Sequence, residues 1–222
     1  MKSNVLVIAA SPKAKNGNSE SLADFFAQEL NNVVTTKVNL RNEIRKPDAL
    51  VKQMDQSDFI VMSFPVYENA VPGLVQQFFE MIFASKDKLS TRHRKMLVIS
   101  NSGFAEPEAN KYAISQCKQF AEDMQFIWLG GVCVSPGTLI DGKELEKTGG
   151  TYKRVIAILR LTAKRISVGQ DITDKERMMT DRPLMSPFIY RFAGRLIQRG
   201  VAKRIGKSKY NARPFLENSS AH

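Results

Sequence analysis

Continuous apolar segments alternate with segments of helical period along residues 1–170. The apolar segments lack the polar alternation of half-exposed strands, so both of their faces should be covered, as in a parallel sheet. They occupy residues 5–10, 59–62, 96–100 and 126–134, and the more polar residues 33–40 can form a further strand. Helices are predicted at residues 21–30, 47–56, 72–82, 108–124 and 151–168. This order predicts an α/β fold with a five-stranded, doubly wound parallel sheet.

A basic extension follows this domain at residues 171–222. Within it, residues 187–205 have apolar positions at helical spacing beside a cation at every fourth position, which predicts one long helix. The chain has a net charge of +11, and residues 182–222 alone contain nine Lys or Arg and a single Glu. The positive charge is therefore concentrated in the extension. The positive and negative charges of the α/β domain are too nearly equal in number to indicate a nucleic-acid-binding surface.

The two cysteines, Cys117 and Cys133, form neither a spaced metal motif nor a disulfide framework. We therefore expect two free thiols in a reducing compartment, and no metal site. The N-terminal residues do not resemble a secretory signal, and no apolar stretch reaches the roughly 20 residues that span a bilayer. A cytoplasmic location is the expectation.

The loop after the first strand has the groups that a phosphate needs. Ligands bind parallel sheets of this kind outside the carboxyl ends of the strands, where the strand order reverses. Here Ser11, Lys13, Asn18 and Ser19 stand directly before a predicted helix, whose N-terminus favours an anion. The alternative is that Asn18 or Ser19 only caps the helix. The sequence contains neither a G-x-x-x-x-G-K-[ST] loop nor a G-x-G-x-x-G fingerprint after this strand.

The loops after the third and fourth strands are also unusual. In residues 63–72 two prolines stiffen a loop that contains Phe64 and Tyr67, which suits the wall of a flat ligand. Phe64 is better explained as a core residue, whereas Tyr67 and the peptide groups of residues 65–69 fit a ligand site. Residues 100–107 combine Ser, Asn and Gly, which also favour turns for local reasons. Three such loops at one edge of a sheet indicate a shared ligand.

Together these loops resemble those of the flavodoxin-like NAD(P)H-dependent FMN reductases, a family that includes quinone, azo and flavin reductases. The matching segments are SPKAKNGNSESL after the first strand, FPVYENAVPGL after the third, ISNSGFAEP after the fourth and WLGGV near the fifth. The resemblance covers residues 1–170. It implies that this part of the chain is a flavodoxin-like, FMN-binding domain.

The resemblance also implies a role for each matching position. Residues that would hold the FMN phosphate are Ser11, Lys13, Asn18 and Ser19. Residues that would border the isoalloxazine are Pro65, Val66, Tyr67, Glu68 and Asn69 on one side, and Asn101, Ser102, Gly103 and Phe104 on another. The first loop is one residue longer than the commoner family form, so the cation that reaches the phosphate is either Lys13 or Lys15.

In the implied reaction NAD(P)H reduces FMN, and the flavin passes the electrons to a small quinone, flavin, azo or nitro compound. No catalytic side chain is required, which agrees with the presence of only two histidines, His93 and His222. Two alternatives are an electron-carrying flavodoxin without its own substrate and a cofactor-free interaction module. The basic extension argues against the carrier, and the intact loops argue against the module.

The predicted helix at residues 187–205 has three uses to consider. It can contact another subunit, pack on its own domain, or lie on an anionic membrane surface. The family resemblance favours protein contact, because these reductases are often dimers with the flavin at the interface. Residues 213–215, Arg-Pro-Phe, also resemble a family ending. We therefore expect a homodimer, with membrane contact as the alternative.

Overall fold

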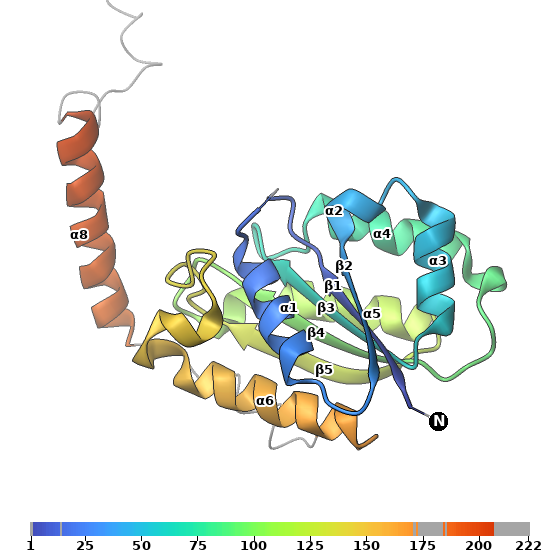
Figure 1. The fold of residues 1–222 in the computed structure, drawn as a ribbon. Coiled ribbons are helices and arrows are strands. Elements are labelled where there is room, and N and C mark those ends of the chain that lie inside the picture. The colour runs from blue at the N-terminus through green and yellow to red at the C-terminus, as the bar shows by residue number, and fades with distance from the viewer. Residues whose placement is uncertain (1, 14, 171, 173–183, 185, 207–222) are drawn as a thin grey trace, which may run out of the picture. The chain divides into compact units, whose positions relative to one another are not determined.

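The computed structural model describes residues 2–13, 15–170, 172, 184 and 186–206 (Figure 1). The chain divides into two compact units, Met1–Leu184 and Met185–His222. The strands of the first unit are β1 (Asn4–Ala9), β2 (Val34–Asn39), β3 (Phe59–Pro65), β4 (Lys95–Asn101) and β5 (Ile127–Val134). Its helices are α1 (Asn18–Glu29), α2 (Leu40–Glu43), α3 (Pro47–Gln56), α4 (Gly73–Ala84), α5 (Lys111–Asp123) and α6 (Lys153–Ser167). The second unit contains α8 (Pro187–Ile205).

All five strands are parallel and lie in the order β2-β1-β3-β4-β5. The flavodoxin-like, doubly wound sheet predicted from the sequence is therefore confirmed. Within the sheet, β2 lies on one side of β1 and β3 lies on the other side. The strand order thus reverses between β1 and β3, and the loops after these two strands meet at the carboxyl edge of the sheet.

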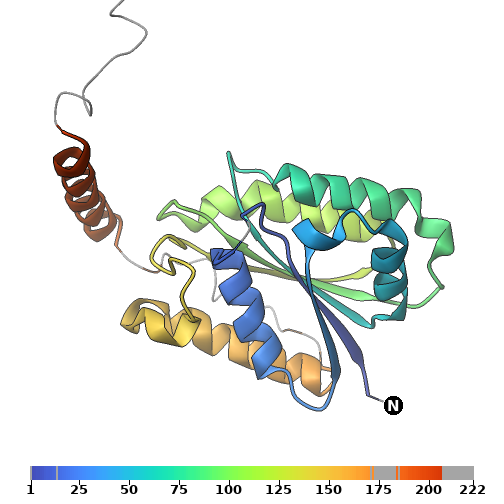
Figure 2. The same cartoon turned by 45° about the horizontal axis from the view of Figure 1, so that its top comes forward.

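Each face of the sheet has its own apolar core. On one face, α3, α4 and α5 cover a cluster that includes Leu50, Phe78 and Phe120. On the other face, α1 and α6 cover a cluster that includes Phe26 and Ile158. Figure 2 shows the two helical layers on opposite sides of the sheet. Burial of each such side chain contributes on the order of 1.5–3 kcal/mol, so both faces hold the sheet rigid beneath its loops.

One strand is longer than its apolar run predicts. The sequence places the end of the third strand before residues 63–65, but β3 continues through Pro65. The reason is its neighbour, because β4 extends to Asn101 and pairs with β3 to the end, with Pro65 opposite Asn101. This expectation was therefore wrong at residues 63–65, which belong to the sheet and carry the following turn out to its edge.

The bounds of α8 are those predicted from the sequence, beginning at Pro187 and ending at Ile205. Proline at the first position suits a helix start, since its missing N–H would have no partner there. The family-like ending at residues 213–215 lies outside the described residues. Among the helices that the structure describes, none is long and apolar enough to cross a membrane.

A buried arginine ties the opposite, amino edge of the sheet together. Arg94 is 2% exposed and donates hydrogen bonds to the backbone carbonyls of Met54, Asp55, Ser90 and Arg92. Its Nη2 also lies 2.6 Å from Asp55 Oδ1. Burial lowers the pKa of Arg94. The Ser90 N–H and hydroxyl, followed by the charge of Arg94, lower the pKa of the Asp55 carboxyl.

Candidate functional site

Asn101, the last residue of β4, joins the three loops at the carboxyl edge. Its buried side chain donates to Ser19 Oγ across 2.8 Å and to the Phe64 carbonyl across 3.1 Å. Its own carbonyl accepts a 2.7 Å hydrogen bond from the Val66 N–H. These bonds connect the segments that follow β1 and β3 to the end of β4. The sequence-predicted ligand loops are therefore held together by hydrogen bonds within the protein.

The loop after β1 presents hydroxyls and free N–H groups at the start of α1. Ser11 and Ser19 are buried, with 6% and 1% exposure. The N-cap residue of α1 is Gly17, and no side chain caps the helix. The first-turn N–H groups therefore remain available to a ligand, with the positive end of the helix dipole behind them. A Cβ at Gly17 would lie 3.2 Å from Ser11 Oγ, so this position has little room for a larger residue.

Two other residues of this loop make bonds inside the protein. Asn18 Nδ2 donates to the Gly137 carbonyl across 2.9 Å, and Asn18 Oδ1 accepts from the Gly142 N–H across 3.0 Å. The side chain of Asn18 thus bridges the first loop to the loop after β5. Lys13 Nζ donates to the Asn16 carbonyl across 2.9 Å, while Lys15 is exposed. The assignment of either lysine to a phosphate stays a prediction.

The loop after β5 packs directly on the first loop. Gly142 has a φ of +67°, and a Cβ there would lie 2.3 Å from the Asn16 carbonyl oxygen. Asn16 itself has a φ of +54°. The contact therefore requires a glycine at 142, both for its backbone conformation and for the close approach.

The loop after β3 forms a tight two-residue turn. Tyr67 and Ala70 exchange backbone hydrogen bonds of 3.2 and 2.9 Å. Glu68 and Asn69 between them have φ angles of +48° and +63°, the conformation of a type I′ turn. Val66 is buried and Pro65 half-buried, whereas the side chain of Tyr67 is 53% exposed. Among the described residues, no acceptor is found for the N–H groups of Glu68 and Asn69.

A buried polar network supports the loop after β4. Ser102 and Ser135 share a hydrogen bond of 2.9 Å between their hydroxyls, and Asn110 Nδ2 donates to both. Beyond this network Gly103 and Phe104 reach the surface, where Phe104 is 50% exposed. The aromatic rings of Tyr67 and Phe104 are thus presented by two neighbouring loops whose bases are fixed.

Sequence reasoning missed the contribution of the loop after β5. Residues 135–142 supply Ser135, Gly137 and Gly142, each of which supports one of the predicted ligand loops. A signal was present, since Ser-Pro-Gly directly follows a buried strand, as turn-forming residues do in the other three loops. The role of Asn110 could not be predicted from its neighbours in the sequence, because only the fold brings Ser102 and Ser135 close to its side chain.

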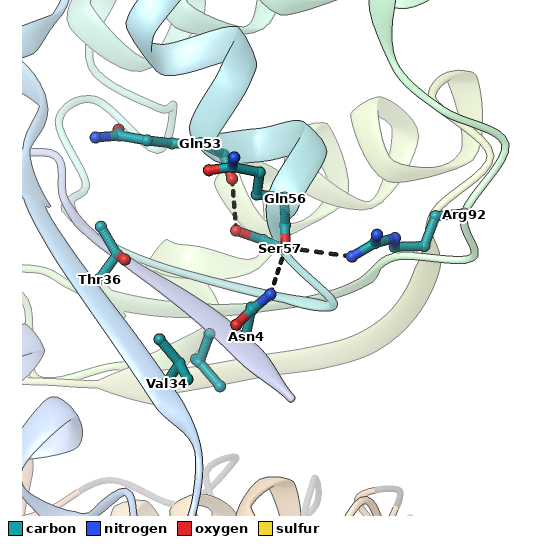
Figure 3. A pocket seen from close by; sticks show the side chains of 8 residues that line it. Asn4, Val34, Thr36, Gln53, Gln56, Ser57 and Arg92 are labelled. Carbon is teal, nitrogen blue, oxygen red and sulfur yellow. Dashed lines mark hydrogen bonds between the residues drawn. The ribbon is translucent and has the colours of Figure 1, made fainter. Parts of the chain in front are cut away.

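A small pocket of about 260 Å³ lies at the other edge of the sheet (Figure 3). Asn4, Val34 and Ser57 lie on its wall, at or before the amino ends of three strands. Two of its polar side chains bond to one backbone oxygen, since Asn4 Nδ2 and Arg92 Nη1 both donate to the Gln56 carbonyl. Since ligands of such sheets bind at the carboxyl ends, this pocket is not the candidate site.

The comparisons with solved structures agree with the fold. An FMN-dependent NADH-azoreductase from Bacillus anthracis, solved with FMN, is 13% identical, with a TM-score of 0.51 over 74% of this chain and 99% of that chain. An NADH:FMN oxidoreductase in its apo form is 12% identical, with a TM-score of 0.59 over 79% and 94%. A flavone reductase is 14% identical, with a TM-score of 0.54 over 99% and 98%. A search of curated proteins found no match.

The family itself is identified by sequence. Residues 3–114, which include all three predicted ligand loops, match the family model described as NADPH-dependent FMN reductase. This match spans half of the chain. The protein therefore belongs to the NADPH-dependent FMN reductase family and is an FMN-dependent oxidoreductase.

Proposed function

We propose that this chain binds FMN at the carboxyl edge of its sheet and transfers electrons from NADH or NADPH to a small quinone, flavin, azo or nitro compound. The observation that carries the proposal is the convergence of three loops on Asn101, at the point where the strand order reverses. The names of the structural neighbours, which include an azoreductase and a flavone reductase, support an acceptor of this size and kind.

The start of α1 fits the phosphate of FMN. The uncapped first turn offers backbone N–H donors, and the hydroxyls of Ser11 and Ser19 lie beside it. Ser19 Oγ accepts from Asn101, which leaves its own proton free to donate. Hydrogen bonds from such groups to a charged phosphate are about twice as strong as neutral ones. Asn18 would act mainly by holding the loop, and Lys13 or Lys15 by its charge.

The second and third loops fit the flavin ring. Tyr67 and Phe104 supply exposed aromatic surface, while Pro65 and Val66 form a rigid base for the turn. The N–H groups of Glu68 and Asn69 have no acceptor within the part of the chain that the structure describes. We assign the remaining border to the backbone and side chains at the end of β4, which are Asn101, Ser102, Gly103 and Phe104.

The protein's part in the reaction is to bind, orient and stabilise. When bound, FMN supplies the redox chemistry, taking a hydride from the nicotinamide and giving electrons to the acceptor. The N–H groups of Glu68 and Asn69 would stabilise negative charge on the ring, because fixed donors need no reorganisation. The tight turn and its fixed base would hold Tyr67 against the cofactor. No side chain of the loops is needed as a nucleophile or general base.

The test is a titration followed by an assay. Purified apoprotein should bind FMN and then oxidise NADH or NADPH in the presence of a quinone, a free flavin or an azo compound. A flavin-loaded protein that oxidises neither nucleotide with any acceptor would contradict the proposal. The same assay decides between the two nucleotides. We place the reaction in a reducing cytoplasm, where the thiols of Cys117 and Cys133 would stay reduced.

A further inference from the structure

The proposed reaction assigns no role to helix α8, whose charge is all of one sign. Its nineteen residues include four Arg and one Lys but no acidic residue. Figure 1 shows α8 as one uninterrupted helix. All five cations are exposed, and none of them forms an ion pair with a described residue. The described part of the chain therefore leaves the positive charge of α8 uncompensated.

The cations of α8 repel one another. Four of them follow at intervals of four residues, which places them in a line along one side of the helix: Arg191, Arg195, Arg199 and Lys203. Like charges at this spacing destabilise a helix. The helix dipole favours cations only in the last turn, where Lys203 and Arg204 lie. The earlier part of the line is therefore stabilised only by negative charge that comes from outside the helix.

Two glycines weaken the helix further. Gly194 and Gly200 lie in its interior, where glycine loses more conformational freedom than alanine does. Most helices in proteins are stabilised by the surface on which they pack, and not by propensity alone. The glycines and the line of like charges make α8 especially dependent on such a surface.

The first two turns of α8 expose three large apolar side chains. The exposed fractions of Phe188, Ile189 and Phe192 are 78%, 56% and 57%. A basic helix face that only contacts water would account for the cations but not for this apolar group, since a cluster of exposed apolar side chains marks an interaction site. The surface that α8 contacts must therefore accept apolar side chains as well as positive charge.

We propose that α8 binds the surface of an anionic membrane. It would lie along the headgroup layer, with Phe188 and Phe192 at the boundary of the acyl chains and the cations at the lipid phosphates. The apolar stems of Arg and Lys allow their charged ends to stay among the headgroups while the rest of the helix lies deeper. Since a charge in the bilayer core is costly, a helix with five cations lies on the membrane and does not cross it.

Other partners fit α8 less well. A nucleic acid attracts cations and stacks on aromatic rings, but it offers no apolar medium for Ile189. A protein partner would have to supply several carboxylates beside an apolar surface, although charged residues are depleted in the core of protein interfaces. An anionic bilayer presents phosphates and acyl chains together in one continuous layer.

Co-sedimentation of the full-length protein with vesicles tests the proposal. The wild type should bind vesicles that contain phosphatidylglycerol, should bind vesicles of phosphatidylcholine alone much more weakly, and should be released by salt. Arg191→Gln/Arg195→Gln/Arg199→Gln should lower the partition coefficient about 100-fold, because each cation near an anionic surface contributes about fivefold. Phe188→Ser/Phe192→Ser should lower it at least about tenfold, because it removes the apolar contact.

The control variant has the same change in net charge outside α8. Arg41→Gln/Lys52→Gln/Lys111→Gln neutralises three exposed cations of the first unit and should bind vesicles as the wild type does. The variant Phe192→Trp reports on insertion. Its emission should shift to shorter wavelength on vesicles and be quenched by brominated acyl chains, because the indole moves to the membrane interface. The wild type, whose single tryptophan is Trp128, gives the background signal.

Thermal melts and FMN titration of each variant exclude misfolding as the cause of lost vesicle binding. Three results would overturn the proposal. The first is a wild type that does not bind the anionic vesicles, and the second is equal binding by the wild type and both α8 variants. The third is a wild type that binds a mixed-sequence RNA, or assembles into an oligomer, through the same α8 side chains while vesicles leave it in solution. In that case α8 contacts a nucleic acid or another protein chain instead.

Discussion

Asn101 Nδ2 and Ser19 Oγ lie 2.8 Å apart, although 82 positions separate them in the chain. This bond and the one from Asn101 to the Phe64 carbonyl are buried. Loss of the Asn101 amide would leave two buried acceptors without their donor. The same side chain therefore contributes to the stability of the fold and to the geometry of the ligand loops.

We predict that Asn101→Leu lowers the free energy of unfolding by about 2–3 kcal/mol, because buried polar groups lose their partners. FMN affinity should fall at least about tenfold, since the loops are no longer joined. Urea unfolding and fluorescence titration of FMN measure the two effects. Asn31→Leu, at an exposed position, is the control. Unchanged affinity in a destabilised Asn101 variant would separate this residue from the ligand site.

Ser19→Ala should reduce the affinity for FMN by about 10–100-fold through loss of a charge-assisted hydrogen bond. Affinity for riboflavin, which has no phosphate, should change little. The ratio of the two dissociation constants is therefore the measurement. Asn18→Ala should instead weaken both ligands and the fold, since its side chain holds the loop after β5. An equal loss for both ligands in the Ser19 variant would remove this hydroxyl from the phosphate site.

Replacement of Tyr67 by Ala should shift the flavin absorption spectrum and its midpoint potential, because the surroundings of the ring tune the cofactor. Stability should change by less than about 0.5 kcal/mol, as the side chain is half exposed. Tyr112→Ala removes an equally large and more exposed ring from α5 and is the matched control. Identical spectra for the wild type and the Tyr67 variant would show that Tyr67 does not contact the flavin.

The turn between Tyr67 and Ala70 allows a test of backbone conformation. Asn69 has a φ of +63°, which a β-branched residue adopts only with strain. Asn69→Val should therefore lower stability by about 1–2 kcal/mol and weaken FMN binding, whereas Asn69→Gly should preserve both. Thermal melts and FMN titration of the pair measure this difference. Equal melting temperatures for the two variants would mean that the turn is not of this type in solution.

The lowered pKa of Asp55 predicts how the stability of the fold changes with pH. Its pKa in the folded protein lies below the ordinary value of 3.8, chiefly through donation from Ser90. The unfolded chain therefore takes up this proton first as the pH falls. The stability contributed by ionised Asp55 is present above about pH 4 and is lost as the pH falls through the folded pKa.

Asp55→Asn should consequently reduce the loss of stability between about pH 5 and pH 2, while it lowers stability at pH 7 by removing the partner of Arg94. Urea midpoints at several pH values give the comparison. Asp48→Asn is the control, because the side chain of Asp48 is almost fully exposed. An Asp55 variant whose pH profile parallels that of the wild type would assign the acid sensitivity to other groups.

Much of the fold could be predicted from local sequence. The apolar runs predicted where most strands lie along the chain. Proline at the first helical position predicted the exact first residue of α3 and of α8. The ends of the strands were harder to predict. The extension of β3 to Pro65 depends on pairing with Asn101, 36 residues later, and hydrophobic period contains no information on such pairing.

The candidate site was predicted in outline but not in its bonds. Local composition identified three loops as ligand loops, and the fold brings them to one edge. Local composition could not show that Asn18 bonds to Gly137 and Gly142, or that Asn101 bonds to Ser19, because these partners are more than 80 positions away in the chain. The roles of the individual residues towards FMN remain predictions that the variants above would test.

The cross-links among the ligand loops have a consequence for the kinetics of cofactor uptake. Asn18 and Asn101 assemble the loops through bonds that involve no ligand atom. A receptor already in its bound shape loses little conformational entropy on association, and its backbone moves little. FMN should therefore bind in a single second-order phase, without a slow first-order step. The apoprotein should also stay folded during purification and bind FMN again when it is added.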